Sequence, residues 1–170
     1  MTARKKQAIT IALVFTALSW TRAYADFSGK VIAVKDGDTL KVLRDSTTAV
    51  TVRLYGIDCP ERGQAFAQKA KQAASVLAFG KTVTVVEKDV DRYGRTVGNV
   101  ILEDGRSLNH ELVRSGLAWW YRKYAPKDTE LETLEKAARE VKAALWADVN
   151  PVPPWQWRKE RRSKTRGRKR

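Results

Sequence analysis

The chain has 170 residues, of which 43% are hydrophobic and 31% are charged. This length and composition fit a single globular domain with a hydrophobic core, and they exclude a wholly disordered chain. The formal net charge of +14 favours an anionic partner, either nucleic acid or an anionic membrane surface.

The positive charge is concentrated at the two ends of the sequence. Residues 1–25 contain four cations and no acid, and residues 158–170 contain nine cations and one acid. The remaining segment, 26–157, therefore carries a net charge of only +2. We expect a folded body that is close to neutral, with basic character at its ends.

The first residues have the pattern of a secretory signal peptide. Arg4, Lys5 and Lys6 precede the apolar run AITIALVFTALSW, and AYA at 23–25 has small residues at processing positions. This run is shorter than the roughly 20 residues that a membrane-spanning helix needs. We therefore expect cleavage of residues 1–25 near Ala25 and Asp26, giving a secreted or periplasmic protein. An uncleaved signal would instead anchor the protein to a membrane.

Five short segments have the patterns of β-strands. Residues 29–45, GKVIAVKDGDTLKVLRD, alternate around Asp-Gly-Asp as the two strands of a hairpin do. Residues 48–57, 81–90 and 95–105 repeat the alternation and end in turn residues. Five strands of this length, with helices between and after them, are typical of a small closed barrel.

Three segments have helical spacing. They are residues 62–80, ending at Gly80, residues 107–118, beginning at the cap-like Ser107, and residues 128–146, with an acidic first turn. We predict an α+β fold, mainly β: a five-stranded barrel of the oligonucleotide-binding (OB) type with three packed helices. The domain would span residues 26–157.

The C-terminal segment has a different composition. NPVPPWQW, residues 150–157, is predicted to be extended because prolines disfavour helix. Residues 158–170 are low in complexity and predicted to be a disordered basic tail. Its cations would neutralise phosphates of nucleic acid, although a merely solvating tail or attraction to anionic lipid is an alternative.

Ionisable residues cluster where three of the predicted strands end. Asp36 and Asp38 flank the hairpin glycine, VRLYGIDCPE at 52–61 places Arg53, Asp58 and Glu61 together, and DVDRYGR follows at 89–95. Each cluster alone has an ordinary explanation as a turn, a solvated pair or a helix cap. Composition and spacing alone predict a basic barrel protein, with nucleic acid as one candidate partner.

The ordered combination of these segments resembles the staphylococcal (micrococcal) nuclease family. The matching segments are VIAVKDGDTLKV, VRLYGIDCPERGQAFAQKAK, DVDRYGRTVGNVILEDGRSLNHELVRSGLA and the final ALW. The resemblance spans about residues 29–157 and leaves out the signal and the basic tail. It implies an OB-type barrel and Ca²⁺-dependent hydrolysis of DNA and RNA with little sequence specificity, giving 3′-phosphate ends. We expect a monomer, since nothing in the sequence implies a stable protein partner.

The resemblance also implies roles for the clustered acids. Asp38 and Asp58 would be carboxylate ligands of Ca²⁺, and the backbone carbonyl of Cys59 would be a further ligand. Glu61 would be the general base or would orient the attacking water. Carboxylate and carbonyl oxygens are the ligands that Ca²⁺ prefers, and a nearby carboxylate can accept the proton of the water.

Arginines and tyrosines complete the implied site. Arg53 and Arg95 would grip the phosphate, for which the planar guanidinium is well suited because it donates two parallel hydrogen bonds. Two tyrosines would line the nucleotide pocket: Tyr93 and Tyr124. Another pocket tyrosine of the family falls on Arg122 here, with Tyr121 one position earlier. A non-catalytic barrel that lacks these acids is the competing interpretation, and the presence of the full set argues against it.

Overall fold

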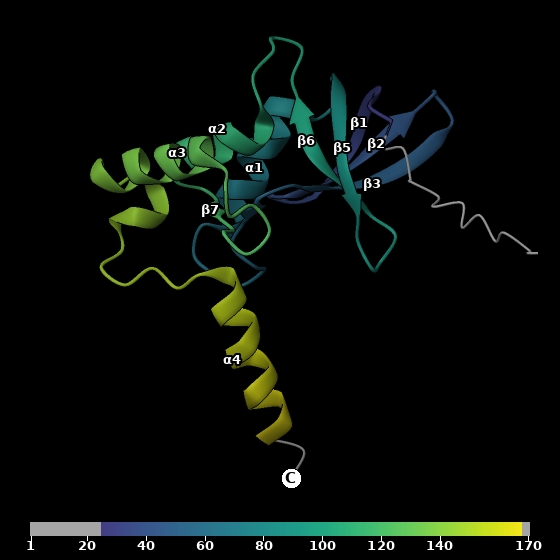
Figure 1. Ribbon diagram of the computed structural model, residues 1–170. Helices are drawn as coiled ribbons and strands as arrows, with labels where there is room; N and C mark the ends of the chain where they lie inside the picture. The colour runs from purple at the N-terminus through teal and green to yellow at the C-terminus, as the bar shows by residue number, and fades with distance from the viewer. Residues whose placement is uncertain (1–24, 168–170) are drawn as a thin grey trace, which may run out of the picture.

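A computed structural model describes residues 25–167, and within them five strands form a closed barrel (Figure 1). The strands follow one another around the barrel in the order β1-β2-β3-β6-β5. Their bounds are β1 Phe27–Asp36, β2 Thr39–Arg44, β3 Thr48–Leu54, β5 Thr82–Val90 and β6 Thr96–Ile101. Only β3 and β6 run parallel, and the other pairs are antiparallel. The predicted five-stranded barrel is confirmed.

The alternation of the strands explains why the barrel closes around an apolar interior. β-Branched residues favour a pleated surface, and every second residue faces inward. The interior contains buried valines from five strands: Val31, Val42, Val52, Val83, Val85 and Val100. Gly98 allows β5 to approach closely, because a Cβ atom there would lie 2.6 Å from the carbonyl oxygen of Val86.

The three predicted helices are present, two of them against the barrel and the third against the second. They are α1 Ala67–Ala78, α2 Leu108–Arg114 and α3 Thr129–Glu140. α1 packs on β1 and presents three buried alanines, while α2 packs against α1, α3 and β6. Ser107 and Asp128 cap the starts of α2 and α3 by accepting hydrogen bonds from backbone N–H groups.

The expected single helix over residues 128–146 is wrong. α3 ends at Glu140, positive φ angles at Lys142 and Ala144 turn the chain, and a 3₁₀ helix η1 follows at Ala144–Ala147. This turn brings the indole of Trp146 to 4.4 Å from that of Trp119, measured between ring centroids. Burial of these two rings is a tertiary contact, which the local helical pattern does not contain.

A short two-stranded ribbon connects the barrel to this tryptophan cluster. β4 Ile57–Asp58 pairs antiparallel with β7 Trp119–Trp120, so that Asp58 lies opposite Trp119. Strands of two residues are too short for their alternation to be recognised in a sequence. The ribbon fixes the backbone that carries Asp58.

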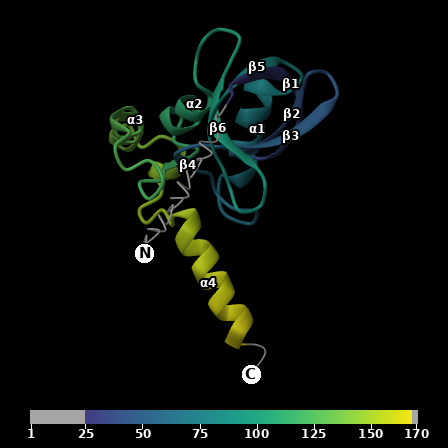
Figure 2. The same cartoon turned by 45° about the vertical axis from the view of Figure 1, so that its right-hand side comes forward.

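The C-terminal segment forms a fourth helix, α4 Pro154–Gly167, which projects from the rest of the protein (Figures 1 and 2). The predicted extended structure over residues 150–157 is therefore wrong from Pro154 onward, and the predicted disorder of the tail is wrong for residues 158–167. Proline is favoured at the first position of a helix, and arginine, lysine and glutamine are good helix formers. Low complexity therefore does not prevent helix formation here.

The predicted signal peptide lies outside the described residues except for Ala25. Within residues 25–167, no helix combines the length and the apolarity required to cross a membrane.

Candidate active site

Asp38 lies in the tight turn between β1 and β2, where the backbone holds it from both sides. Its carboxylate Oδ2 accepts a hydrogen bond from the Cys59 N–H at 2.6 Å, and its carbonyl accepts one from the Leu54 N–H at 2.9 Å. Gly37 makes this turn possible, since a Cβ atom there would lie 2.8 Å from both Ala70 Cβ and Cys59 Sγ. Asp38 is 6% exposed.

Arg53, near the end of β3, joins two acids that are twenty positions apart in the sequence. Its Nη1 lies 2.8 Å from Asp38 Oδ2, and its Nη2 lies 2.8 Å from Asp58 Oδ1. The register of β2 and β3 explains this position, because Arg53 pairs with Thr39, the residue after Asp38. The structure therefore brings together three of the predicted site residues.

Glu61 and Asp58 are joined by a residue that the sequence patterns do not assign to the site. Arg158 of α4 places Nη2 2.7 Å from Asp58 Oδ2 and Nη1 2.5 Å from Glu61 Oε1. Glu61 lies in the loop before α1, where the side-chain oxygen of Gln64 accepts from its N–H at 2.8 Å. The acids Asp38, Asp58 and Glu61 and the arginines Arg53 and Arg158 form one alternating array, which we call the acid–arginine cluster.

Burial and charge shift the pKa values of this cluster. Burial raises the pKa of the Asp38 carboxyl to about 7, against the opposing effect of Arg53, and the neighbouring acids Asp36 and Asp58 raise it further. Burial alone would lower the pKa of Arg53, but Asp38 and Asp58 outweigh it and raise that pKa. Burial and Asp38 raise the pKa of the Cys59 thiol, which keeps the sulfur protonated and unsuited to act as a nucleophile.

Arg95 and Tyr93 lie in the turn between β5 and β6, outside the acid–arginine cluster. Arg95 Nε lies 2.7 Å from Asp91 Oδ2, and its guanidinium lies 5.7 Å from the ring centroid of Tyr93. Among residues 25–167, no hydrogen bond or ion pair joins Arg95 to Asp38, Asp58 or Glu61. Partial burial would raise the pKa of Asp91, but hydrogen bonds from Arg95 and Tyr93 lower it, so Asp91 holds Arg95 as a carboxylate.

Tyr124 and its neighbours lie in the loop between β7 and α3. Tyr124 is 60% exposed, as Tyr93 is at 67%, so both rings are available to a ligand. Tyr121 packs edge-on against Tyr124 and stacks on Trp155, with ring centroids 5.0 Å apart. Arg122, where the resemblance implies a tyrosine, lies 3.1 Å from Glu135 and over the ring of Trp120.

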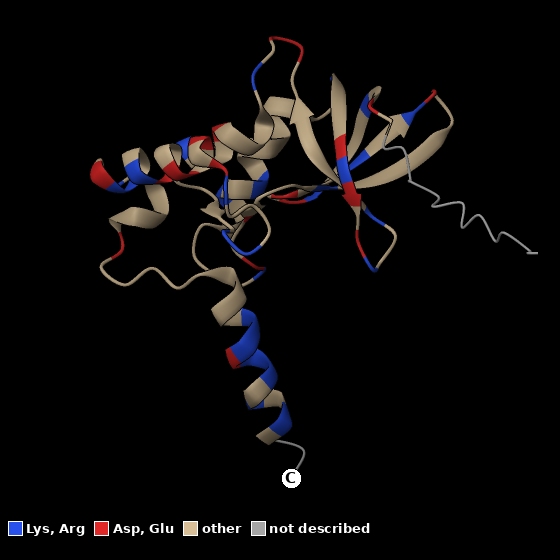
Figure 3. Ribbon diagram, in the orientation of Figure 1, with Lys and Arg blue, Asp and Glu red and all other residues tan. Residues whose placement is uncertain are grey.

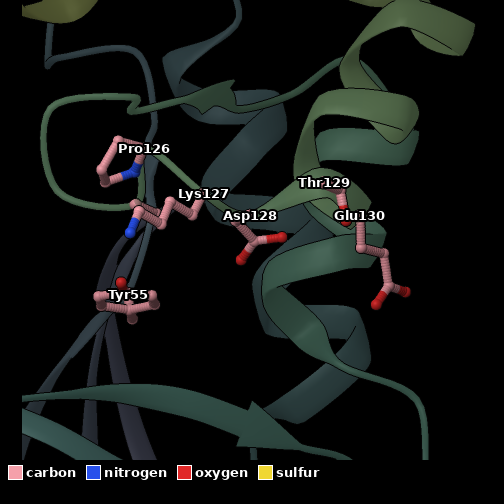
Figure 4. Close-up of a pocket in the computed structure, with 7 residues that line it drawn as sticks. Tyr55, Pro126, Lys127, Asp128, Thr129 and Glu130 are labelled. Carbon is pink, nitrogen blue, oxygen red and sulfur yellow. The ribbon is translucent and has the colours of Figure 1, made fainter.

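A hollow of about 550 Å³ beside this loop does not include the cluster. It is formed by Tyr55, residues 125–128 of the loop and the first two residues of α3, and Figure 4 shows side chains from these segments around it. Asp128 in this loop caps α3 by accepting from the Leu131 N–H at 3.0 Å. None of the clustered acids lines the hollow, so we assign it no role in their chemistry.

The acid–arginine cluster offers a partial ligand set for a divalent cation. In the part of the chain that the structure describes, no group of three His, Cys, Asp or Glu side chains is arranged to hold a metal ion. Asp38 and Asp58 nevertheless converge, and the backbone of Cys59 lies beside Asp38. Such a set fits a hard cation like Ca²⁺, which completes its coordination with carbonyl oxygens and water.

Comparison with known proteins finds relatives that are named as nucleases or endonucleases. The family model described as "Staphylococcal nuclease homologue" matches residues 51–148. A protein named "Uncharacterized endonuclease" from Escherichia coli O157:H7 is 45% identical over 148 residues, covering 87% of this chain and 95% of the relative. "Micrococcal nuclease" from Shigella flexneri is 39% identical over 174 residues, covering 97% of each chain. An "Uncharacterized endonuclease" from Haemophilus influenzae is 38% identical over 157 residues, covering 92% and 86%.

Proposed function

We propose a mechanism from the premise that the chain belongs to the staphylococcal nuclease family. It is an endonuclease of the micrococcal nuclease type. We propose that it hydrolyses phosphodiester bonds of DNA and RNA with little sequence specificity and leaves 3′-phosphate ends. The observation that supports this most strongly is the convergence of Asp38 and Asp58 on Arg53, with Glu61 linked to the same array.

The arginines would stabilise the charge that develops on the phosphate. Attack of water on a phosphodiester adds negative charge to its equatorial oxygens, and cations directed at these oxygens stabilise the transition state more than the ground state. Arg53 is held in place between two buried acids and would present its guanidinium to the phosphate. Arg95 lies on the β5–β6 turn, and it would exchange Asp91 for the phosphate when substrate binds.

Glu61 would accept the proton of the attacking water. Its loop position and partial exposure make it accessible to solvent, unlike Asp58, which is 1% exposed. A positioned carboxylate in this role typically contributes about 10²–10⁴-fold to the rate. In this mechanism Arg158 must release Glu61 before the carboxylate can act as a base.

We propose Ca²⁺ as the cofactor, held by the carboxylates of Asp38 and Asp58 and the backbone carbonyl of Cys59. When bound, Ca²⁺ would supply Lewis acidity and orient the phosphate relative to the water. The protein's own contribution is to keep the two carboxylates close together, through Arg53 and the Cys59 N–H.

The remaining features complete the proposal. Tyr93 and Tyr124 would stack on the bases of the substrate, because aromatic rings bind single strands without sequence preference.

We propose a monomer that is exported and released after removal of residues 1–25. The mass of the protein recovered outside the cell tests this: a chain beginning at Asp26 supports release, and a chain retaining Met1 supports membrane anchoring.

Digestion of a supercoiled plasmid tests the mechanism. We expect cleavage with Ca²⁺ and none with chelator, and Mg²⁺ tests metal selectivity. Glu61→Gln should lose about 10²–10⁴-fold in rate, and Arg95→Ala about 10²–10³-fold. The exposed residues Glu132 and Arg114, changed to Gln and Ala, serve as matched controls with expected full activity. Full activity in chelator, or in both site variants, would refute the mechanism.

Direct phosphorylation of the products by polynucleotide kinase tests the product ends, because the kinase acts on 5′-hydroxyl ends, which form together with 3′-phosphate ends.

A further inference from the structure

A second hollow, of about 480 Å³, lies where α4 meets the loop that carries Glu61. It is lined by Glu61, Trp157 and four arginines of α4: Arg158, Arg161, Arg162 and Arg166. We call it the arginine pocket. Its one acid, Glu61, is the proposed general base, and its other lining residues lie beyond residues 51–148, which the family model matches.

α4 is held against the domain at its first turn, which fixes the position of this pocket. Pro154 is buried, and the ring of Trp155 stacks on Tyr121 and packs edge-on against Trp119 at 5.6 Å. Just before the helix, Gln64 Nε2 donates to the Val152 carbonyl at 3.0 Å. The next turn places Arg158 on Asp58 and Glu61, and the rest of the helix extends outward (Figure 2).

The positive charges of the arginine pocket are only partly balanced by acids within residues 25–167. Arg158 is paired with two acids, but no ion pair is found for Arg161, Arg162 or Arg166 among the residues that the structure describes. Basic residues cover most of α4 beyond its first turn (Figure 3). Three such guanidinium groups beside one hollow attract an anion with several charges.

We propose that the arginine pocket is a second phosphate-binding subsite, which holds the nucleic-acid strand next to the phosphate that is cleaved. Arg158, Arg162 and Arg166 are spaced by four residues, so they form a row about 12 Å long on one side of the helix. A row of this length can contact more than one phosphate of a strand that runs along it. The strand enters the row at Arg158, which already contacts the acids of the active site.

This inference rests on the proposed function for the location of the cleaved phosphate, but its binding step can be measured without cleavage. The test compares two double variants that each remove two positive charges from α4. Arg161→Gln with Arg162→Gln changes the pocket, and Lys159→Gln with Lys164→Gln changes residues that do not line it. Glutamine favours helix, so circular dichroism should be unchanged in both.

Binding of a labelled single-stranded oligonucleotide is measured in chelator, by fluorescence anisotropy at several salt concentrations. We expect the pocket variant to bind about tenfold more weakly, and the lysine variant no more than about twofold. Loss of two phosphate contacts should lower the slope of log K against log salt by about 1.4 in the pocket variant. Equal weakening by both variants, or no weakening by either, would overturn the subsite.

Two more measurements distinguish a nucleic-acid subsite from a membrane-binding helix and from the proposed catalytic function. If the pocket variant loses binding to anionic lipid vesicles and retains oligonucleotide binding, the pocket serves a membrane surface and the proposal is overturned. In cleavage assays with Ca²⁺, the pocket variant should raise KM for a long oligonucleotide and leave KM for a dinucleotide unchanged. If the wild type binds the oligonucleotide through the pocket but cleaves no substrate, the proposed function is refuted and the subsite is supported.

Discussion

Arg53 organises the active site because it holds two carboxylates that would otherwise repel each other. Its side chain is 16% exposed, and it contacts Asp38 and Asp58 at equal distances of 2.8 Å. Buried charges are tolerated when they are paired and hydrogen-bonded, and removing one partner of such a pair is costly. The same arrangement that stabilises the acids keeps a guanidinium beside the proposed position of the phosphate.

The raised pKa of Asp38 predicts a pH-dependent stability. The pKa is about 7 in the folded protein, against an ordinary value of 3.8, so the folded state retains a proton that the unfolded state has lost. The stability contributed by this proton is complete below about pH 4 and is lost as the pH rises through 7. Between pH 5 and pH 8 in chelator, the wild type should lose about 1–3 kcal/mol of unfolding free energy relative to Asp38→Asn. Urea unfolding at each pH measures this difference, and parallel pH curves for the two proteins would contradict it.

Among individual residues, the sequence is informative about residue types and less so about their partners. It predicts that Asp38, Arg53 and Asp58 converge, and they do. Glu61 is joined to them through Arg158, which the sequence places in a disordered tail because composition carries no signal for a contact across about 100 residues. The convergence is a matter of position only: the roles of these residues, like those of Arg95, Tyr93 and Tyr124, stay predictions.

The turn between β1 and β2 determines where the carboxylate of Asp38 lies. Gly37 has no space for a side chain, because α1 and the Cys59 side chain pack directly against it. The turn therefore couples the position of a proposed metal ligand to the packing of a helix on the barrel.

Gly37→Ala should disturb both stability and the site. The added methyl group would overlap Ala70 and Cys59, and overpacking of this kind costs about 1–3 kcal/mol. We expect lower unfolding free energy and weaker Ca²⁺ binding, measured by urea unfolding and calorimetric titration. Gly105→Ala is the control for cation binding: its φ of +82° strains an alanine and lowers stability, but a Cβ atom there meets nothing within 4 Å, so Ca²⁺ binding should be unchanged. Ca²⁺ binding by Gly37→Ala at wild-type affinity would show that the turn does not position Asp38.

Elements with their own periodicity are predictable from the sequence, whereas those defined by distant contacts are not. The five barrel strands and α2 follow local alternation and capping. The break after Glu140 has no glycine or proline to mark it, and it arises from the burial of Trp146 against Trp119. The same reason applies to α4, because its anchor is the stacking of Trp155 on Tyr121 from another part of the chain.

The whole molecule combines a nearly neutral barrel domain with a basic helix that begins at the active site. The barrel brings together acids from the β1–β2 turn, from β4 and from the loop before α1, and α4 adds Arg158 to them. In the proposed subsite, the cations of α4 lie along the path of a nucleic-acid strand bound next to the active site. The fold class was predictable because barrel closure follows from strand number and pattern.

The central claim is that Asp38 and Asp58 converge to bind one divalent cation that cleavage requires. Calorimetric titration of Ca²⁺ into the wild type, Asp58→Asn and the exposed control Asp45→Asn tests it most directly, alongside plasmid cleavage by the same samples. We predict one site in the wild type and the control, and at least about tenfold weaker binding with loss of cleavage in Asp58→Asn. Wild-type affinity in Asp58→Asn, or cleavage by the wild type in excess chelator, would contradict the account.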